Sequence, residues 1–351
     1  MSIYERNGHY YAIVYIDGKQ KWLAAGTNRS KAKALHDEWT VKARRGELVV
    51  PKPVLFSDFS EIWLNDYCEI RLKPVTVYEY RGYLRKHLLP VFGHMKLAAI
   101  RPEQVQRFVK AKVDEGLSPK TVKNMLVPVK RMYAMAIQWG YATRSPAQHI
   151  ALPRIEHIER AFLTPPQMKS LIEATDPKWK ALIACACMCG LRKGECLGLT
   201  WDSVLWDERK IHVQRSMWHH KLQTPKTKKS QAKVPMSTTL ESLLLERMTV
   251  SPASEMNLVF CRDDGSPLRQ EYVNNGILSP ALERAGLPRV TFHELRHSFV
   301  GALIAENLPL KVIQEMARHA SIQTTLDRYG HLMPNAKEDA AAKLERAVWG
   351  E

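Results

Sequence analysis

Apolar and polar positions alternate at the start of the chain. Residues 9–24 keep this two-residue period on both sides of Asp17-Gly18, which predicts two strands joined by a tight turn. Glycine supplies the positive φ that such a turn requires. In residues 30–45 the apolar positions recur at helical spacing instead. A small β-sheet with one helix is therefore expected at the N-terminus.

The next hundred residues follow only the helical period. Four helices are predicted, at residues 57–69, 74–88, 102–115 and 118–139, with breaks at Pro90, Gly93, Gly116 and Gly140. Pro128 lies inside the fourth helix, where it lacks a backbone donor and is expected to kink the helix. This region is expected to be an all-α domain.

From about residue 160 onward, helical stretches alternate with short β-type stretches. Helices are expected at 166–174, 178–189, 193–199, 238–247, 270–285, 292–307, 310–317, 322–332 and 336–348, and strands at 210–214 and 233–236. This mixture predicts a mainly helical α+β domain with a small antiparallel sheet.

Length and composition fit a protein of two or three domains. The chain has 351 residues, of which 45% are hydrophobic, enough for buried cores at roughly 100–200 residues per domain. Proline-containing stretches at 47–53 and 144–166 are typical of linkers. We therefore expect domains at residues 1–48, 54–146 and 160–351.

Charge narrows the class of partner. The chain has 52 lysines and arginines against 36 aspartates and glutamates, a net charge of +16. Residues 51–150 alone hold 16 basic and 8 acidic side chains. Such an excess of positive charge favours a polyanionic partner, most commonly nucleic acid. The alternative is a basic surface that only aids solubility.

Membrane insertion and secretion are not expected. The longest apolar run, residues 181–191, is about half of the roughly 20 residues that span a bilayer. Residues 1–6 lack the basic-then-apolar order of a signal peptide, which predicts a cytoplasmic protein.

Cysteines are not expected to carry chemistry. Six of them in 351 residues are too few for a disulfide framework. Four lie close together, but they lack the C-x-x-C spacing of zinc sites. These four, Cys185, Cys187, Cys189 and Cys196, are expected to be small core side chains.

An arginine follows the end of an apolar helix in the segment Gly190-Leu191-Arg192-Lys193-Gly194-Glu195. Backbone N–H groups at a helix start and a guanidinium can both donate to a phosphate oxygen. The segment is a candidate anion site, although an arginine near a helix start is more often simply solvated.

The segment His293-Glu294-Leu295-Arg296-His297 is compatible with two chemistries. H-E-x-x-H on a helix places two imidazoles one turn apart with a glutamate base, as in zinc peptidases. Arg296 would place a permanent cation beside such a metal. Alternatively, His293 and Arg296 donate together to an anion. A capped, partly buried helix start without chemistry is the third interpretation.

Two more segments carry candidate residues. His319 is followed ten residues later by Tyr329, and only Tyr272 and Tyr329 occur after residue 150. A tyrosine nucleophile needs cationic neighbours and a proton acceptor at neutral pH, and packing is the alternative role. Residues 224–230 are expected to form a basic hairpin tip with three lysines, Lys226, Lys228 and Lys229.

The order of these segments resembles that of the tyrosine recombinases of the phage-integrase family. Residues 190–201 resemble the family's first arginine box, and residues 291–329 resemble its second box. Residues 117–147 are similar to the end of its core-type, SAM-like DNA-binding domain. The first 45 residues resemble the arm-binding sheet of integrases from phages and conjugative transposons.

The resemblance implies a role for each motif residue. Tyr329 would attack a DNA phosphodiester, form a 3′-phosphotyrosyl bond and release a 5′-hydroxyl. The donors to the non-bridging oxygens would be Arg192, Arg296 and His319. His293 would contact the scissile phosphate, and Lys226 would protonate the leaving oxygen, with Lys228 and Lys229 as neighbouring candidates. Glu195 would support the site, and the DNA contacts would include Lys19, Lys21, Lys120 and Lys123.

Partners and cofactors also follow from the resemblance. It implies duplex attachment sites bound by a homotetramer, accessory DNA-bending or excision-directing proteins, and no membrane. No metal is implied. Re-ligation needs no ATP, because the phosphotyrosyl diester conserves the bond energy. The expected function is an integrase that inserts and excises a mobile element. Its alternatives are a chromosome-dimer resolvase of the same chemistry, a non-catalytic DNA-binding relative and a zinc peptidase.

One position departs from the family pattern. The family usually has glycine immediately before the histidine at 319, where this chain has Arg318. A bulky side chain there could change how His319 approaches the phosphate, or the arginine could add a phosphate contact.

Overall fold

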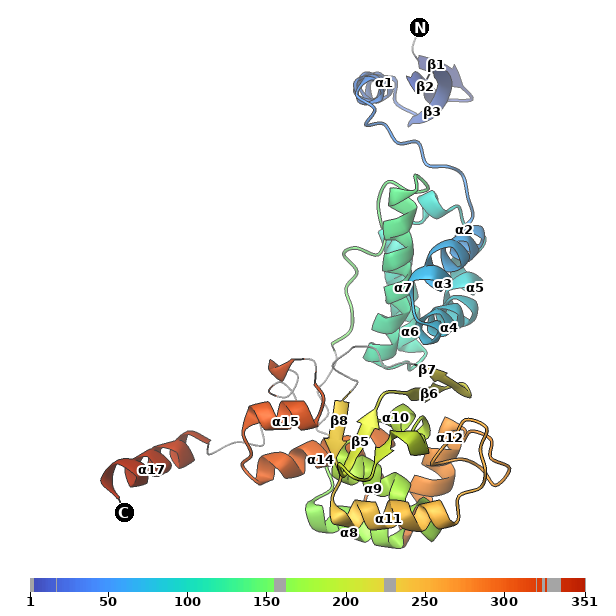
Figure 1. Ribbon diagram of the computed structural model, residues 1–351. Coiled ribbons are helices and arrows are strands. Elements are labelled where there is room, and N and C mark those ends of the chain that lie inside the picture. The colour runs from blue at the N-terminus through green and yellow to red at the C-terminus, as the bar shows by residue number, and fades with distance from the viewer. Residues whose placement is uncertain are drawn as a thin grey trace. The chain divides into compact units, whose positions relative to one another are not determined.

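The computed structural model describes residues 3–16, 18–154, 162–223, 232–319, 321–323, 326 and 336–350. The chain forms two compact units, residues 1–157 and 158–351. Figure 1 shows the elements of each unit. No helix within the described ranges is long and apolar enough to cross a membrane.

A three-stranded antiparallel sheet and one helix begin the first unit. The elements are β1 (Ile3–Arg6), β2 (His9–Ile16), β3 (Lys19–Gly26) and α1 (Arg29–Arg44). Asn28 caps α1 because its side chain accepts the N–H of Lys31 at 3.0 Å. The predicted strand pair and helix are confirmed. The sequence analysis missed β1, whose side chains are mostly exposed and carry no clear alternation.

The rest of the first unit is helical and packs around its own apolar core. Its α-helices are α2 (Phe56–Trp63), α3 (Glu69–Arg71), α4 (Pro74–Tyr83), α5 (Leu89–Phe92), α6 (Pro102–Asp114) and α7 (Pro119–Gln138). Inside the core, the Trp63 ring stacks on Tyr80, and the Tyr133 hydroxyl donates to the Leu97 carbonyl at 2.9 Å.

Two prolines of this region lie within helical segments. The predicted break at Pro90 is wrong, because a π-helical turn over 84–88 joins α4 to α5 and Pro90 lies in the first turn of α5. The N–H of Leu89, immediately before the proline, still donates to the Leu84 carbonyl, so the helix continues into α5. Pro128 lies inside α7, which continues through it as a single helix.

The second unit is mainly helical with two small antiparallel sheets. Its helices are α8 (Pro165–Ala174), α9 (Lys180–Cys189), α10 (Lys193–Leu197), α11 (Thr238–Thr249), α12 (Gln270–Tyr272), α13 (Ser279–Arg284), α14 (Phe292–Ala305), α15 (Leu310–Met316) and α17 (Ala336–Trp349). The strands are β4 (Val204–Leu205), β5 (Lys210–Val213) and β8 (Ala232–Pro235) in one sheet, and β6 (Ser216–Trp218) and β7 (Lys221–Gln223) in the other. The expected mainly helical α+β architecture is confirmed.

Helix α9 is at the centre of this unit. Nearly all of its side chains are buried, and α8, α11 and α14 pack around it (Figure 1). Because a helix that is apolar on all sides must be covered on all sides, the packing of the core fixes the position of the end of α9.

The expected hairpin near residue 226 needs a correction. Strands β5 and β8 do pair, as predicted, but a second ribbon, β6–β7, is inserted between them. His219 and His220 turn this ribbon, both at positive φ. The tip predicted at residues 224–230 therefore falls between β7 and β8, which belong to different sheets. These residues, and most of the helix expected at 322–332, lie outside the described ranges.

Gly190 should tolerate substitution less well than a glycine of similar backbone angle in open space. It has φ +58°, and an added Cβ would meet the Phe299 ring at 2.5 Å. Gly286 has φ +63° with nothing within 4 Å of an added Cβ. We expect Gly286→Ala to cost about 1–2 kcal/mol of unfolding free energy. Overpacking should add about 1–3 kcal/mol for Gly190→Ala. Urea denaturation measures both, and equal losses would contradict the steric argument.

Candidate active site

A left-handed turn after α9 sets the direction of the first arginine. Gly190 ends α9 at φ +58°, and Arg192 then adopts an extended conformation as the N-cap residue of α10. The Arg192 side chain is 38% exposed, so one end of it reaches solvent. Gly190 is needed here because both its backbone angle and the close Phe299 ring exclude a side chain.

Glu195 binds this arginine twice. Its Oε1 accepts from the Arg192 guanidinium at 2.6 Å, and its Oε2 accepts from the Arg192 backbone N–H at 2.8 Å. The carboxylate itself is only 4% exposed. Burial opposes its ionisation, but the charges of Arg318 and Arg192 and the hydrogen bonds from Arg192 outweigh that effect and lower the pKa of Glu195.

Arg296 ties this turn to two distant segments. It projects from the first half of α14 and is buried. Its guanidinium donates to the Gly190 carbonyl and to the Ala317 carbonyl. The arginine therefore joins the end of α9 to the end of α15.

The H-E-x-x-H segment forms the start of α14. Glu294 accepts the backbone N–H of Thr291 at 2.6 Å, so its carboxylate caps the helix. The His293 ring is exposed and packs edge-on against His297, with ring centroids 4.7 Å apart. Within the described ranges, no three His, Cys, Asp or Glu side chains form a group that could hold a metal ion.

Arg318 points into the protein. Its side chain is 1% exposed and donates to Glu195 Oε2 at 2.7 Å and to the Gly190 carbonyl at 3.1 Å. The next residue, His319, is half-buried, and its backbone N–H and carbonyl both bond to Gln314. Sequence analysis missed the contact between Arg318 and Glu195; the only signal for it was an arginine at a position where glycine is usual.

The structure thus brings together part of the predicted site. Arg192, Glu195 and Arg296 meet around Gly190, with Arg318 as an addition. Tyr329, Lys226, Lys228 and Lys229 lie outside the described residues. The four lysines predicted to contact DNA are exposed, on β3 and in the first turns of α7: Lys19, Lys21, Lys120 and Lys123.

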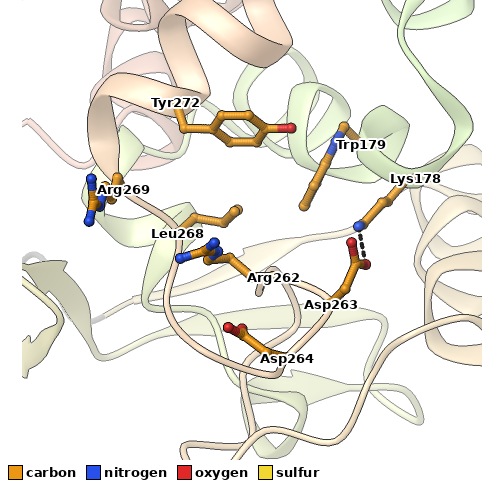
Figure 2. Close-up of a pocket in the computed structure, with 8 residues that line it drawn as sticks. All are labelled: Lys178, Trp179, Arg262, Asp263, Asp264, Leu268, Arg269 and Tyr272. Carbon is orange, nitrogen blue, oxygen red and sulfur yellow. Dashed lines mark hydrogen bonds and ion pairs between the residues drawn. The ribbon is translucent and has the colours of Figure 1, made fainter.

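A separate pocket of about 540 Å³ contains none of these residues. Figure 2 shows Tyr272 on its wall, opposite the ion pair of Lys178 and Asp263. The Tyr272 ring packs edge-on against Trp179 at 6.4 Å between centroids. Tyr272, the second tyrosine of the C-terminal part, is therefore a wall residue of this pocket.

The four neighbouring cysteines are core residues, as predicted. All are buried in the apolar cluster around α9. Burial raises the thiol pKa of Cys187 and Cys189 to about 12, so both stay protonated at neutral pH.

Comparison with known proteins identifies the family of this chain. The model of the phage integrase family matches residues 161–336, half of the chain, and that of the phage integrase N-terminal SAM-like domain matches residues 55–113. The chain belongs to the phage integrase family. It is therefore a site-specific DNA recombinase of the tyrosine type.

Relatives of this recombinase match it over almost its whole length. A tyrosine recombinase XerC-like protein of Caldanaerobacter subterraneus is 27% identical, covering 97% of each chain. The integrase of Salmonella phage P22 is 24% identical, covering 98% of this chain and 94% of that one.

Solved structures share the fold. The Tn1549 transposon integrase in complex with a circular intermediate DNA has a TM-score of 0.73 at 19% identity, covering 83% of this chain and 99% of that one. The lambda integrase tetramer bound to a Holliday junction has a TM-score of 0.62 at 17% identity, covering 91% and 96%.

Glu195→Gln should destabilise the recombinase in a pH-dependent way. Because the folded state lowers the pKa of Glu195, the ionised carboxylate contributes stability above its unfolded pKa of about 4.3, and this is lost as pH falls through the lower folded pKa. We expect Glu195→Gln to cost about 3–5 kcal/mol at pH 7, because it leaves the buried Arg318 without its anion.

Glu241→Gln is the matched control, because Glu241 pairs with the exposed Arg209 at 3.2 Å. It should cost less than about 1 kcal/mol. Urea denaturation between pH 3 and pH 7 measures both variants. A Glu195→Gln loss that stays constant over this range would contradict the electrostatic argument.

Proposed function

We propose that this recombinase is an integrase that inserts and excises a mobile element through a 3′-phosphotyrosyl intermediate. The observation that carries the proposal is the meeting of Arg192 and Arg296 at the Gly190 turn. The two arginines are 104 positions apart in the sequence. Glu195 accepts from Arg192, and the Gly190 carbonyl, two residues before Arg192, accepts from Arg296. Such a convergence of donors suits a phosphate with developing negative charge.

The proposed chemistry is a transfer between two phosphodiesters. The Tyr329 oxygen attacks the scissile phosphorus, the P–O5′ bond breaks, and the DNA 3′ end becomes linked to tyrosine. Arg192, Arg296 and His319 donate to the non-bridging oxygens, whose negative charge is largest in the transition state. A 5′-hydroxyl then attacks the phosphotyrosine to reverse the step, so the bond is conserved and no ATP is consumed.

Protons move through two further groups in this proposal. Lys226 protonates the leaving 5′ oxygen, with Lys228 and Lys229 as the neighbouring alternatives. His293 contacts the scissile phosphate from the exposed face of α14 and accepts the proton that the Tyr329 hydroxyl loses as it attacks. Neither step requires a metal ion.

The remaining parts of the chain are proposed to bind DNA and other protomers. Residues 1–48 contact arm sites, residues 54–146 contact core sites, and residues 160–351 cut the DNA. Four protomers act together on duplex attachment sites, with accessory DNA-bending or excision-directing proteins. Helix α17 exposes Leu344, Val348 and Trp349, an apolar stripe suited to a neighbouring protomer. With duplex DNA as its substrate, the protein is proposed to act in the cytoplasm.

The integrase function is favoured over a chromosome-dimer resolvase by the N-terminal sheet. This sheet and α1 form a complete small fold with its own buried core, and its β3 strand exposes Lys19 and Lys21. An additional basic module serves an enzyme that must bind two kinds of DNA site.

Tyr329→Phe should abolish the covalent adduct with DNA. The tests use labelled duplexes that tile the DNA flanking the protein's own gene, with EDTA present, and score an SDS-resistant, protease-sensitive complex. Phenylalanine removes the nucleophilic oxygen, so the adduct should disappear while binding persists. Tyr272→Phe is the control and should form the adduct, because Tyr272 lies on the wall of the separate pocket. An adduct with Tyr329→Phe would refute the assignment of the nucleophile.

Lys19→Ala with Lys21→Ala should separate the integrase from the resolvase. Loss of two exposed phosphate contacts should reduce the salt slope of arm-site binding by about 2. Adduct formation on an isolated core site should stay at the wild-type rate. Gel-shift titrations at several salt concentrations measure the slope. Equal loss on arm and core duplexes would favour one continuous binding surface, as expected for a resolvase.

A further inference from the structure

Arg318 occupies a backbone conformation that opposes its side chain. It has φ +52°, in the left-handed region where glycine is favoured. Its guanidinium is nevertheless buried, and the Nε and Nη1 groups have no hydrogen-bond partner among the described residues. Strain, burial of a cation and unpaired donors all cost free energy, so the surrounding structure must hold this arginine in place.

The contacts of Arg318 converge on the catalytic arginines. Glu195 uses Oε1 for the Arg192 guanidinium at 2.6 Å, and Oε2 for Arg318 at 2.7 Å. The Gly190 carbonyl accepts from both Arg318 and Arg296. Arg318 is therefore connected to each of the two arginines through a shared acceptor.

The arrangement preserves the positive charge of Arg192. A glutamate that holds Arg192 also cancels its positive charge, and that charge is what the transition state needs. A second guanidinium on the opposite oxygen compensates the carboxylate, because two cations and one anion leave a net positive charge. Arg192 can then be held firmly and still act as a cation toward phosphate.

We propose that Arg318 is a positioning residue that neutralises Glu195, so that Glu195 orients Arg192 without cancelling its charge. This inference rests on the proposed function, in which Arg192 stabilises the scissile phosphate. Arg318 acts through Glu195 and the Gly190 carbonyl, and it does not touch the DNA, since its side chain is only 1% exposed.

The test is a double-mutant cycle on the rate of adduct formation. Arg318→Gly relieves the left-handed strain but leaves Glu195 uncompensated, so the rate should fall about 10²-fold. Adding Glu195→Gln removes the charge that needed compensation, and the double variant should recover at least tenfold over Arg318→Gly. Arg318→Lys keeps the cation and should lose less than tenfold. A residue that only filled space would give additive losses without recovery.

Asn307→Gly is the matched control. Asn307 is also left-handed, with φ +53°, and lies exposed after α14. This variant relieves similar backbone strain and should keep the wild-type rate. Duplex affinity should change less than threefold in every variant, because it rests on many other phosphate contacts.

The same double-mutant cycle can be measured by thermal melting, which needs no DNA substrate. The fall in Tm of the double variant should be smaller than the sum of the two single falls, because Arg318 and Glu195 interact. Additive Tm losses, or a wild-type rate for Arg318→Gly, would overturn the inference. A wild-type protein that formed no adduct would refute the proposed function instead, and the Tm cycle would still decide whether Arg318 and Glu195 are coupled.

Discussion

The carbonyl of Gly190 is the fixed point on which the catalytic unit depends. It stands at the end of α9, a helix buried on nearly every side. Arg296 and Arg318 both donate to it, from α14 and from the end of α15. Because the carbonyl belongs to a left-handed residue pressed against Phe299, its direction is set by the packing of the core. The positions of two guanidinium groups are therefore consequences of how apolar side chains pack.

Buried charge is the second constraint, and it explains why the site is a network. Glu195, Arg296 and Arg318 are all almost fully buried, which is costly for isolated ions. Each is stabilised by at least two polar contacts, and the carboxylate lies between two cations. Removing one member would leave the others buried without partners, so these residues are expected to change function and stability together.

Local signals in the sequence predicted much of this fold. The apolar run of α9 and the alternating positions of β2 and β3 are each determined by neighbouring residues, and the predicted elements match. Order and spacing of the motifs also predicted that Arg192 and Arg296 belong to one site. The short ribbon β6–β7 was missed, because three-residue strands leave too few positions for a period to emerge.

Tertiary contacts account for the rest of what was missed. Nothing near Arg318 in sequence indicates that it turns inward, since its partner Glu195 lies 123 positions away. The π-helical turn before Pro90 likewise depends on packing within the first unit, and a proline alone predicts a break. Long-range pairing of ions and carbonyls becomes visible only when the turn after α9 and the end of α15 are placed together.

The net positive charge of the chain lies mainly in its first 150 residues, outside the part that carries the proposed chemistry. Residues 1–150 hold 25 basic and 13 acidic side chains, whereas residues 151–351 hold 27 and 23 and are nearly balanced. A nearly neutral catalytic unit cannot attract DNA strongly through its total charge, so the long-range field comes from the first 150 residues. Within the second unit, positive charge can stabilise a phosphate only at a place where several cationic side chains lie close together. Arg192 and Arg318 on Glu195, together with Arg296 on the Gly190 carbonyl, provide that concentration at the turn after α9.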